Sequence, residues 1–321
     1  MLRNTIIIAL LATIGSVHLA QAQGGRIAYE TGPRTSSLNH EVIVTDLSGN
    51  DRILLEETVG TQVSGFGGLS WAPDGRRLAT RLRRSNVWDI YAIDTETGAA
   101  VNVTQDSFID RAPAWSPDGR QIAYVSLHGG PAQIYVIGVD GGTPVQLTDN
   151  PSLDETPSWS PDGSQIVFAS NRDGDFEIYV MNADGSDQRR LTVSPRDEFY
   201  PEWSPDGQHI VFFSDFCARC STQQSDIMVM RPDGSDLVNL TNSLAQNIAP
   251  TWSPDGSQIA FSSNRGGAID IFTMNADGSQ VTNVTHNSPS VMSEHAAWAR
   301  LPGAPTAVEM ISWGRVKIER R

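Results

Sequence analysis

The chain has 321 residues, with 37 acidic side chains against 23 basic ones and a formal net charge of −14. This acidic balance argues against nucleic-acid binding, because a phosphate-contacting surface needs a local surplus of Lys and Arg. With 28 glycines, 18 prolines and 39% hydrophobic residues, the composition is that of a turn-rich globular protein rather than a disordered one.

The first residues have the pattern of an export signal. Arg3 precedes an apolar stretch over 6–17, and the Ala-Gln-Ala sequence at 20–22 matches a signal-peptide cleavage site. The apolar stretch is shorter than the roughly 20 residues that span a bilayer. We therefore expect residues 1–22 to be a signal peptide and the mature protein to be periplasmic or secreted, without stable membrane insertion. An uncleaved anchor is the alternative.

The remainder of the chain is a repeat. The string Trp-Ser/Ala-Pro-Asp-Gly occurs five times and an eroded sixth copy follows, so that the units recur every 44 to 49 residues. The repeat tryptophans are Trp71, Trp115, Trp159, Trp203, Trp252 and Trp298. A period in the forties with short strand-like segments is typical of a four-stranded propeller blade.

The unit around Trp159 shows how each copy divides into strands. Strands are expected at 156–160, 165–170, 177–181 and 188–192. The first turn between them contains Pro161, which presets φ, and Gly163, which accepts the positive φ that follows. Four short strands joined by tight turns make one antiparallel blade.

The two ends of the chain are incomplete units that complement each other. The N-terminal segment supplies a second, third and fourth strand, at 26–29, 41–44 and 52–56. The C-terminal copy supplies only a first strand, at 295–299. We therefore predict an all-β fold for residues 23–303, a six-bladed β-propeller with four antiparallel strands per blade, closed by N- and C-terminal strands that share one blade.

The Trp-Ser-Pro-Asp-Gly motif, followed by an Ile-Ala-Phe-Ser-like strand, resembles the repeat of the TolB-type β-propeller family. The resemblance covers about residues 26–300. It implies an exported propeller of the bacterial envelope that binds proteins. The namesake of the family carries an α/β domain ahead of its propeller and serves the Tol–Pal system. Here the first expected strand begins at Arg26, directly after the predicted cleavage point, which argues against a Tol–Pal role.

Residues just before each repeat Trp are the candidate binding site, because the innermost strand of every blade borders the central channel. The candidate partner-binding residues at this channel mouth are Asp110, Arg111, Asp154, Glu155, Glu198, Asn247, Glu294 and His295. A negative mouth suits basic groups of a partner or a cation. Asp110, Asp154 and Glu198 are the candidate metal ligands, with Ca²⁺ as the ion and no other cofactor expected. A solvated rim without a ligand is the alternative.

Other repeated residues are expected to have structural roles. Tryptophans at equivalent positions should pack between neighbouring blades, and the turn aspartates should accept hydrogen bonds from local backbone N–H groups. Two pairs placed across a hairpin, Arg172 with Glu177 and Arg265 with Asp270, are predicted to form ion pairs.

An insertion between Trp203 and Trp252 carries the only two cysteines, Cys217 and Cys220. In an exported protein the simplest prediction is a disulfide bond between them. A redox pair would need a thioredoxin-like context, and a zinc site would need two further ligands. The C-terminal tail, 304–321, alternates apolar and polar residues and is either an extra strand, a docking segment or disordered.

No motif of a known enzyme class stands out, since Gly-x-Ser-x-Gly, His-Glu-x-x-His and phosphate-binding Gly-Lys-Ser/Thr sequences are absent. The sequence predicts an exported, monomeric, non-catalytic propeller, a binding or scaffold protein that recognises a protein or peptide at the channel mouth. The alternative is a hydrolase or lyase that acts on a carbohydrate or peptide, with Glu294 and His295 as the best-placed pair.

Overall fold

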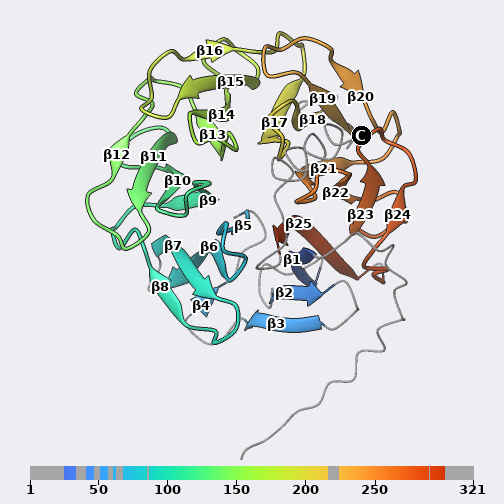
Figure 1. Ribbon diagram of the computed structural model, residues 1–321, viewed down its shortest axis with the longest axis horizontal. Helices are drawn as coiled ribbons and strands as arrows, with labels where there is room; N and C mark the ends of the chain where they lie inside the picture. Colours follow the sequence, from blue (N-terminus) through green and yellow to red (C-terminus); the bar gives the residue numbers. More distant parts are fainter. Residues whose placement is uncertain are drawn as a thin grey trace, which may run out of the picture.

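The computed structural model describes residues 25–33, 41–46, 51–56, 61–62, 68–84, 87–215, 224–288 and 290–300. These residues form six antiparallel sheets, which stand as blades around a central channel (Figure 1). The predicted six-bladed all-β propeller is therefore confirmed. None of the described residues belongs to a helix long and apolar enough to cross a membrane.

The first three blades, in chain order, contain the following strands. Blade 1 consists of β25 (Val291–Arg300), β1 (Gly25–Pro33), β2 (Glu41–Asp46) and β3 (Asp51–Glu56). Blade 2 has β4 (Thr61–Gln62) and β5 (Ser70–Trp71), which both pair with β6 (Arg77–Arg84), then β7 (Val87–Asp94) and β8 (Ala100–Asn102). Blade 3 consists of β9 (Asp110–Trp115), β10 (Gln121–Ser126), β11 (Gln133–Gly138) and β12 (Val145–Gln146).

The other three blades repeat the same order without a break. Blade 4 consists of β13 (Asp154–Trp159), β14 (Gln165–Ser170), β15 (Glu177–Asn182) and β16 (Arg189–Arg190). Blade 5 consists of β17 (Asp197–Trp203), β18 (Ile210–Asp215), β19 (Ser225–Met230) and β20 (Val238–Asn239). Blade 6 consists of β21 (Asn247–Trp252), β22 (Gln258–Ser263), β23 (Asp270–Asn275) and β24 (Thr282–Asn283).

Blade 1 closes the ring with strands from both ends of the chain. β25 pairs antiparallel with β1, so that Ala297 lies opposite Ala28 and Ala299 opposite Arg26. The predicted shared blade is thus confirmed. Because both edges of β1 are paired, neither chain end leaves this strand as an exposed edge.

The repeat motif builds the contacts between blades. Trp115 packs between Ile90 of blade 2 and Ile122 of blade 3, as predicted for the repeat tryptophans. In the turn that follows, Ser116 donates a hydrogen bond to Asp118, which accepts another from the Arg120 N–H group. The same arrangement recurs at Asp162, Asp206 and Asp255, so the turn aspartates hold the loop as expected.

A left-handed residue stands three positions before each repeat Trp, within the inner strand in five blades and just before β5 in blade 2. These residues are Gly68, Ala112, Thr156, Tyr200, Ala249 and His295, with φ between 49° and 72°. The left-handed region is unfavourable for a residue with a Cβ, by about 1–2 kcal/mol. In β9, β13, β17, β21 and β25 the register shifts at or beside this position. The backbone strain of these positive-φ residues therefore lies at equivalent positions of the inner strands around the channel.

Three predictions lie outside the described residues: the signal peptide at 1–22, the disulfide between Cys217 and Cys220, and the tail at 304–321. They stay predictions.

Candidate functional site

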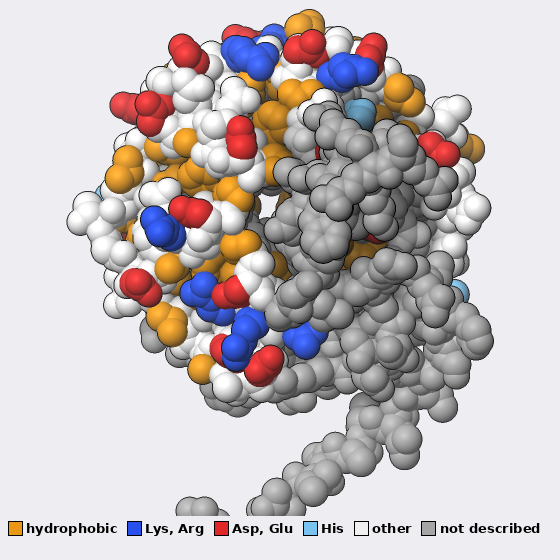
Figure 2. All heavy atoms as spheres, in the orientation of Figure 1, with side chains coloured by type: hydrophobic (Ala, Val, Ile, Leu, Met, Phe, Trp, Pro, Cys, Tyr) orange, Lys and Arg blue, Asp and Glu red, His pale blue; other side chains and the backbone are white. Residues whose placement is uncertain are grey.

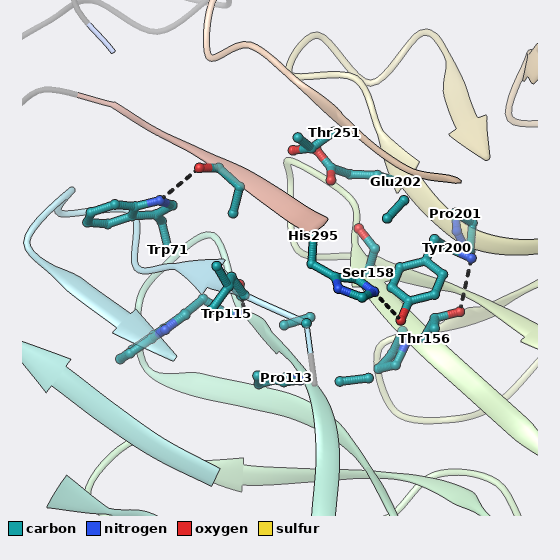
Figure 3. A pocket seen from close by; sticks show the side chains of 18 of the residues that line it. Trp71, Pro113, Trp115, Thr156, Ser158, Tyr200, Pro201, Glu202, Thr251 and His295 are labelled. Carbon is teal, nitrogen blue, oxygen red and sulfur yellow. Dashed lines mark hydrogen bonds between the residues drawn. The ribbon is translucent and has the colours of Figure 1, made fainter. Parts of the chain in front are cut away.

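The central channel contains a cavity of about 270 Å³ that all six blades line. Its wall consists of the last residues of the inner strands, at 68–71, 112–115, 156–159, 200–203, 249–251 and 295–298. Tryptophan, proline and alanine are the most frequent residues of this wall, and Figure 3 shows Trp71, Trp115 and Pro113 together with polar side chains such as Ser158 and Glu202. On the face drawn in Figure 2, hydrophobic side chains flank the central opening and charged side chains lie farther out. The channel wall therefore combines apolar side chains with polar ones, among them Thr156, Ser158, Tyr200, Glu202, Thr251 and His295.

A contact between Tyr200 and His295 crosses the channel. Tyr200 Oη and His295 Nε2 are 3.2 Å apart, joining β17 of blade 5 to β25 of blade 1 (Figure 3). Ala249 of blade 6 occupies the equivalent position between them. Burial lowers the pKa of His295 to about 4, and Arg81 adds to this effect. The imidazole is consequently neutral at physiological pH.

Two carboxyl groups lie behind this imidazole. Glu30 Oε2 is 3.8 Å and Glu294 Oε2 is 4.0 Å from His295 Nδ1. Burial raises the pKa of Glu30 from 4.5 to about 8, although Arg81 opposes this shift, and raises the pKa of Glu294 to about 7. Arg81 is itself buried and stacks on the Trp88 ring at 4.7 Å.

We expect this group to make the protein less stable at alkaline pH. Between pH 6.5 and 8.5 the folded state keeps protons on Glu30 and Glu294 that the unfolded chain has already released, so the free energy of unfolding falls as pH rises. A third buried carboxyl, Glu202, has its pKa raised to about 7 by burial and adds to the effect. The three together correspond to a loss of about 3 kcal/mol. Urea unfolding at pH 6.5 and at pH 8.5, in the presence of EDTA, measures this loss of unfolding free energy.

The variant Glu30→Gln tests the cause of this pH dependence. It removes the carboxyl group with the highest pKa of the three, beside Arg81, Glu294 and His295, and should flatten the profile most. His295 works in the opposite sense, since its lowered pKa makes stability rise with pH, but only below its ordinary value of 6.5. A wild-type profile that is flat or rising above pH 6.5 would contradict the assignment.

The structure separates four of the residues that were predicted to share a mouth. Asp110, Asp154, Glu198 and Asn247 are each at most 3% exposed and lie between neighbouring blades rather than around one opening. Among the described residues, Asp110, Asp154 and Glu198 form no common group of metal-ligating side chains. A single cation held by these three side chains has no geometric basis.

The other four predicted residues do lie in contact, in pairs. Arg111 of β9 forms an ion pair with Glu155 of β13, across blades 3 and 4. Glu294 and His295 belong to the buried group described above. Part of the predicted site is therefore brought together, but as separate pairs rather than as one negatively charged channel mouth.

Both predicted hairpin ion pairs are wrong. Arg172 pairs with Asp154, at 3.0 Å, and Arg265 donates a hydrogen bond to Asn247, at 2.6 Å. Glu177 pairs instead with Arg190. Arg172 and Arg265 each bond to the inner strand of their own blade, and they contact the third strand through an aromatic ring, Tyr179 or Phe272, rather than through its acidic residue.

Four residues of this region were not predicted from the sequence: Tyr200 and Glu202, which line the cavity, and Glu30 and Arg81, which lie behind His295. A signal existed for Tyr200, because it precedes Trp203 by the same interval as His295 precedes Trp298. Glu30 and Arg81 come from second strands, β1 and β6, and carry no repeat signature.

Comparisons with known proteins agree with this architecture. A family model described as the TolB beta propeller domain matches residues 20–152, 112–219 and 216–299. No curated protein matches the sequence. Among solved structures, TolB from Acinetobacter baumannii has a TM-score of 0.72 at 22% identity, over 86% of this chain and 66% of its own. The chain thus spans about two thirds of the length of that TolB.

Two further solved structures show the breadth of the fold. A putative TolB from Agrobacterium tumefaciens has a TM-score of 0.62 at 25% identity, over 87% of this chain and 100% of its own. An oligogalacturonate lyase in complex with manganese has a TM-score of 0.54 at 14% identity, over 81% of this chain and 78% of its own. The lyase likeness shows the fold alone. Because the family model covers nearly all of residues 20–299, the chain belongs to the TolB β-propeller family.

Proposed function

We propose that the protein is an exported, non-catalytic binding or scaffold propeller that holds an extended segment of a protein or peptide partner in its central channel. The periplasm or the extracellular space is the proposed location, and a monomer the proposed state. Membership of the TolB β-propeller family supports a protein-binding role.

One observation carries the proposal, namely the cavity of about 270 Å³ in the central channel, which all six blades line. Concave apolar sites with a few placed polar groups are typical ligand sites, and those for whole small molecules measure about 300–1,000 Å³. The smaller volume here suits one or two side chains of a longer ligand. His295, which is uncharged, and Tyr200 are among the polar side chains of the wall, together with Thr156, Ser158, Glu202 and Thr251.

Filling the channel should abolish partner binding without unfolding the ring. Ala112 has the same left-handed backbone as Tyr200, with φ of 50° against 53°, so Ala112→Tyr is compatible with the strand and adds a ring to the cavity wall. Immobilised wild-type protein is incubated with envelope extract, and the proteins that it retains are identified. The amount of each of these proteins retained by the immobilised Ala112→Tyr variant is then measured. We expect at least a tenfold loss of the specific partner.

Val193→Tyr is the matched control, because Val193 is 86% exposed and absent from the cavity wall. It introduces the same side chain outside the channel and should bind like wild type. Equal retention by Ala112→Tyr, with an unchanged melting temperature, would show that the partner does not enter the channel.

The buried group around His295 favours a second candidate, an enzyme that acts on a carbohydrate or peptide. Carboxyl groups with raised pKa values, such as Glu30 and Glu294, are typical of general acids. Turnover of a glycan or peptide panel by purified protein, lost in His295→Ala, would replace the binding proposal with this one.

A further inference from the structure

Five of the interfaces between blades contain the same set of polar positions, here called the interblade cluster. Each set has four positions. The first three belong to one blade: a residue near the start of its third strand, the Thr that follows its fourth strand, and the residue two positions after that Thr. The fourth is a residue near the start of the inner strand of the next blade. The third-strand residues are Asp89, Gln133, Glu177, Asp226 and Asp270, and the threonines are Thr104, Thr148, Thr192, Thr241 and Thr285. In each cluster the threonine hydroxyl accepts a hydrogen bond from the backbone N–H of the third strand.

In the cluster between blades 3 and 4 the buried charge is neutralised. Asp154 accepts hydrogen bonds from the Asn150 amide, at 2.6 Å, and from the Arg172 guanidinium, at 3.0 Å. Arg172 follows Asp154 by 18 positions and lies over the Tyr179 ring. One acid, one amide donor and one arginine therefore satisfy each other.

In the cluster between blades 5 and 6 the negative charge is also compensated by an arginine, but the residues differ. An amide, Asn247, replaces the aspartate, and Arg265, again 18 positions later, donates to it at 2.6 Å. The Asp226 carboxylate accepts hydrogen bonds from Asn239 and Thr241. One negative and one positive side chain again occupy the interface.

The cluster between blades 2 and 3 lacks this compensation. Asp110 occupies the position of Asp154, and a third carboxylate, Asp106, replaces the amide donor Asn150. His128 stands where the other two clusters have arginine, and its ring stacks on Phe108 at 3.9 Å. Among the described residues, none of the three aspartates in this cluster forms an ion pair within 4.0 Å. Three carboxylates meet here without a cation.

Asp110 provides an independent sign of a missing ligand. Its side chain is 0% exposed, and neither carboxylate oxygen has a hydrogen-bond partner of acceptable geometry, although the Thr104 and Ser126 hydroxyl groups lie nearby. One oxygen each of Asp89, Asp106 and Asp110 lie within 4.8 Å of one another. An unpaired buried carboxylate is costly unless a proton or a cation compensates for it.

We propose that Asp89, Asp106 and Asp110 form a Ca²⁺ site that joins blade 2 to blade 3. Calcium binds oxygen at 2.3–2.6 Å, so two oxygens bound to the same ion are at most about 5.2 Å apart, and the three oxygens here meet this limit. Magnesium demands near-ideal octahedral geometry and usually keeps several waters, with one or two protein carboxylates, so a set of three carboxylates suits calcium better. Asp106 is only half-buried, so the ion can enter from solvent.

Thermal unfolding of the full chain after EDTA treatment and dialysis tests the site. CaCl₂ should raise the melting temperature by about 4 °C at one hundred times its dissociation constant, expected near 0.1–1 mM. NaCl and MgCl₂ at matched ionic strength should give less than half of this rise. Calorimetric titration with CaCl₂ should show one site.

Two variants locate the ion. Asp110→Asn should abolish the calcium-dependent rise, while the protein without calcium melts at the same temperature or higher because a buried charge has been removed. His128→Arg introduces the arginine that the clusters between blades 3 and 4 and between blades 5 and 6 carry, and should likewise stabilise the calcium-free protein and abolish the rise. Asp154→Asn is the matched control: it changes the equivalent residue one blade later and should keep the full calcium effect.

Three results would overturn the proposal. They are equal melting temperatures in CaCl₂ and NaCl, a calcium effect that survives in both Asp110→Asn and His128→Arg, and a calcium effect that disappears in Asp154→Asn but not in Asp110→Asn. An equal rise with MgCl₂ would overturn the assignment to calcium.

Discussion

Deletion of residues 291–321 is expected to unfold the propeller as a whole rather than to shorten one blade. The deletion removes β25, which supplies eight paired positions to β1 and the inner strand of blade 1. It also exposes the edge of β1 and removes Ala296 and Trp298 from the cluster that holds blades 6 and 1 together. We expect a loss on the order of 10 kcal/mol, comparable to the whole stability of a typical domain.

Circular dichroism and urea unfolding measure this loss. Deletion of residues 301–321 is the control, since it leaves every described strand in place. If the chain that ends at 290 still unfolds cooperatively near the wild-type midpoint, the ring does not depend on closure by β25.

Replacement of Trp252 by alanine is expected to cost about 3–5 kcal/mol of unfolding free energy. Trp252 is 6% exposed and packs between Val229 of blade 5 and Ile259 of blade 6, so its loss leaves a cavity at the interface. Urea unfolding should show a lower midpoint. A loss below 1 kcal/mol would mean that neighbouring side chains move in to fill the cavity, which would contradict tight packing of Trp252 between blades 5 and 6.

Two phenylalanine variants separate packing from hydrogen bonding. Trp252 Nε1 has no hydrogen-bond partner, whereas Trp71 Nε1 donates to the Ala297 carbonyl at 3.1 Å. Trp252→Phe should therefore lose only part of the packing energy. Trp71→Phe should lose about 1 kcal/mol more, because an acceptor on the closing strand is left unsatisfied.

Much of the fold could be predicted from the sequence because the repeat is local. The turn after Trp159 needs Pro161 and Gly163 at fixed positions, and the strand that follows needs β-branched and aromatic residues, so each hairpin is encoded within a dozen residues. The incomplete first and last units then leave one way to finish the ring, which is the pairing of β1 with β25.

The candidate site was predicted less well, because side-chain direction depends on neighbouring blades. Successive residues of a strand point to opposite sides. Asp154 and Glu155 were predicted to face one mouth, yet Asp154 meets Arg172 inside the interface and Glu155 meets Arg111. The alternation was present in the sequence, but which side faces another blade was not.

By itself, the sequence determined the blade count, the strand order, the packing role of the repeat tryptophans and the shared closing blade, because these follow from short-range turn chemistry and a fixed period. Only the tertiary structure decided that Glu30 and Arg81 lie close to His295 behind the channel wall and that Asp110 lies beside Asp89 without a compensating arginine. These contacts join residues from different units, and their energies depend on burial, which exists only when the ring is closed.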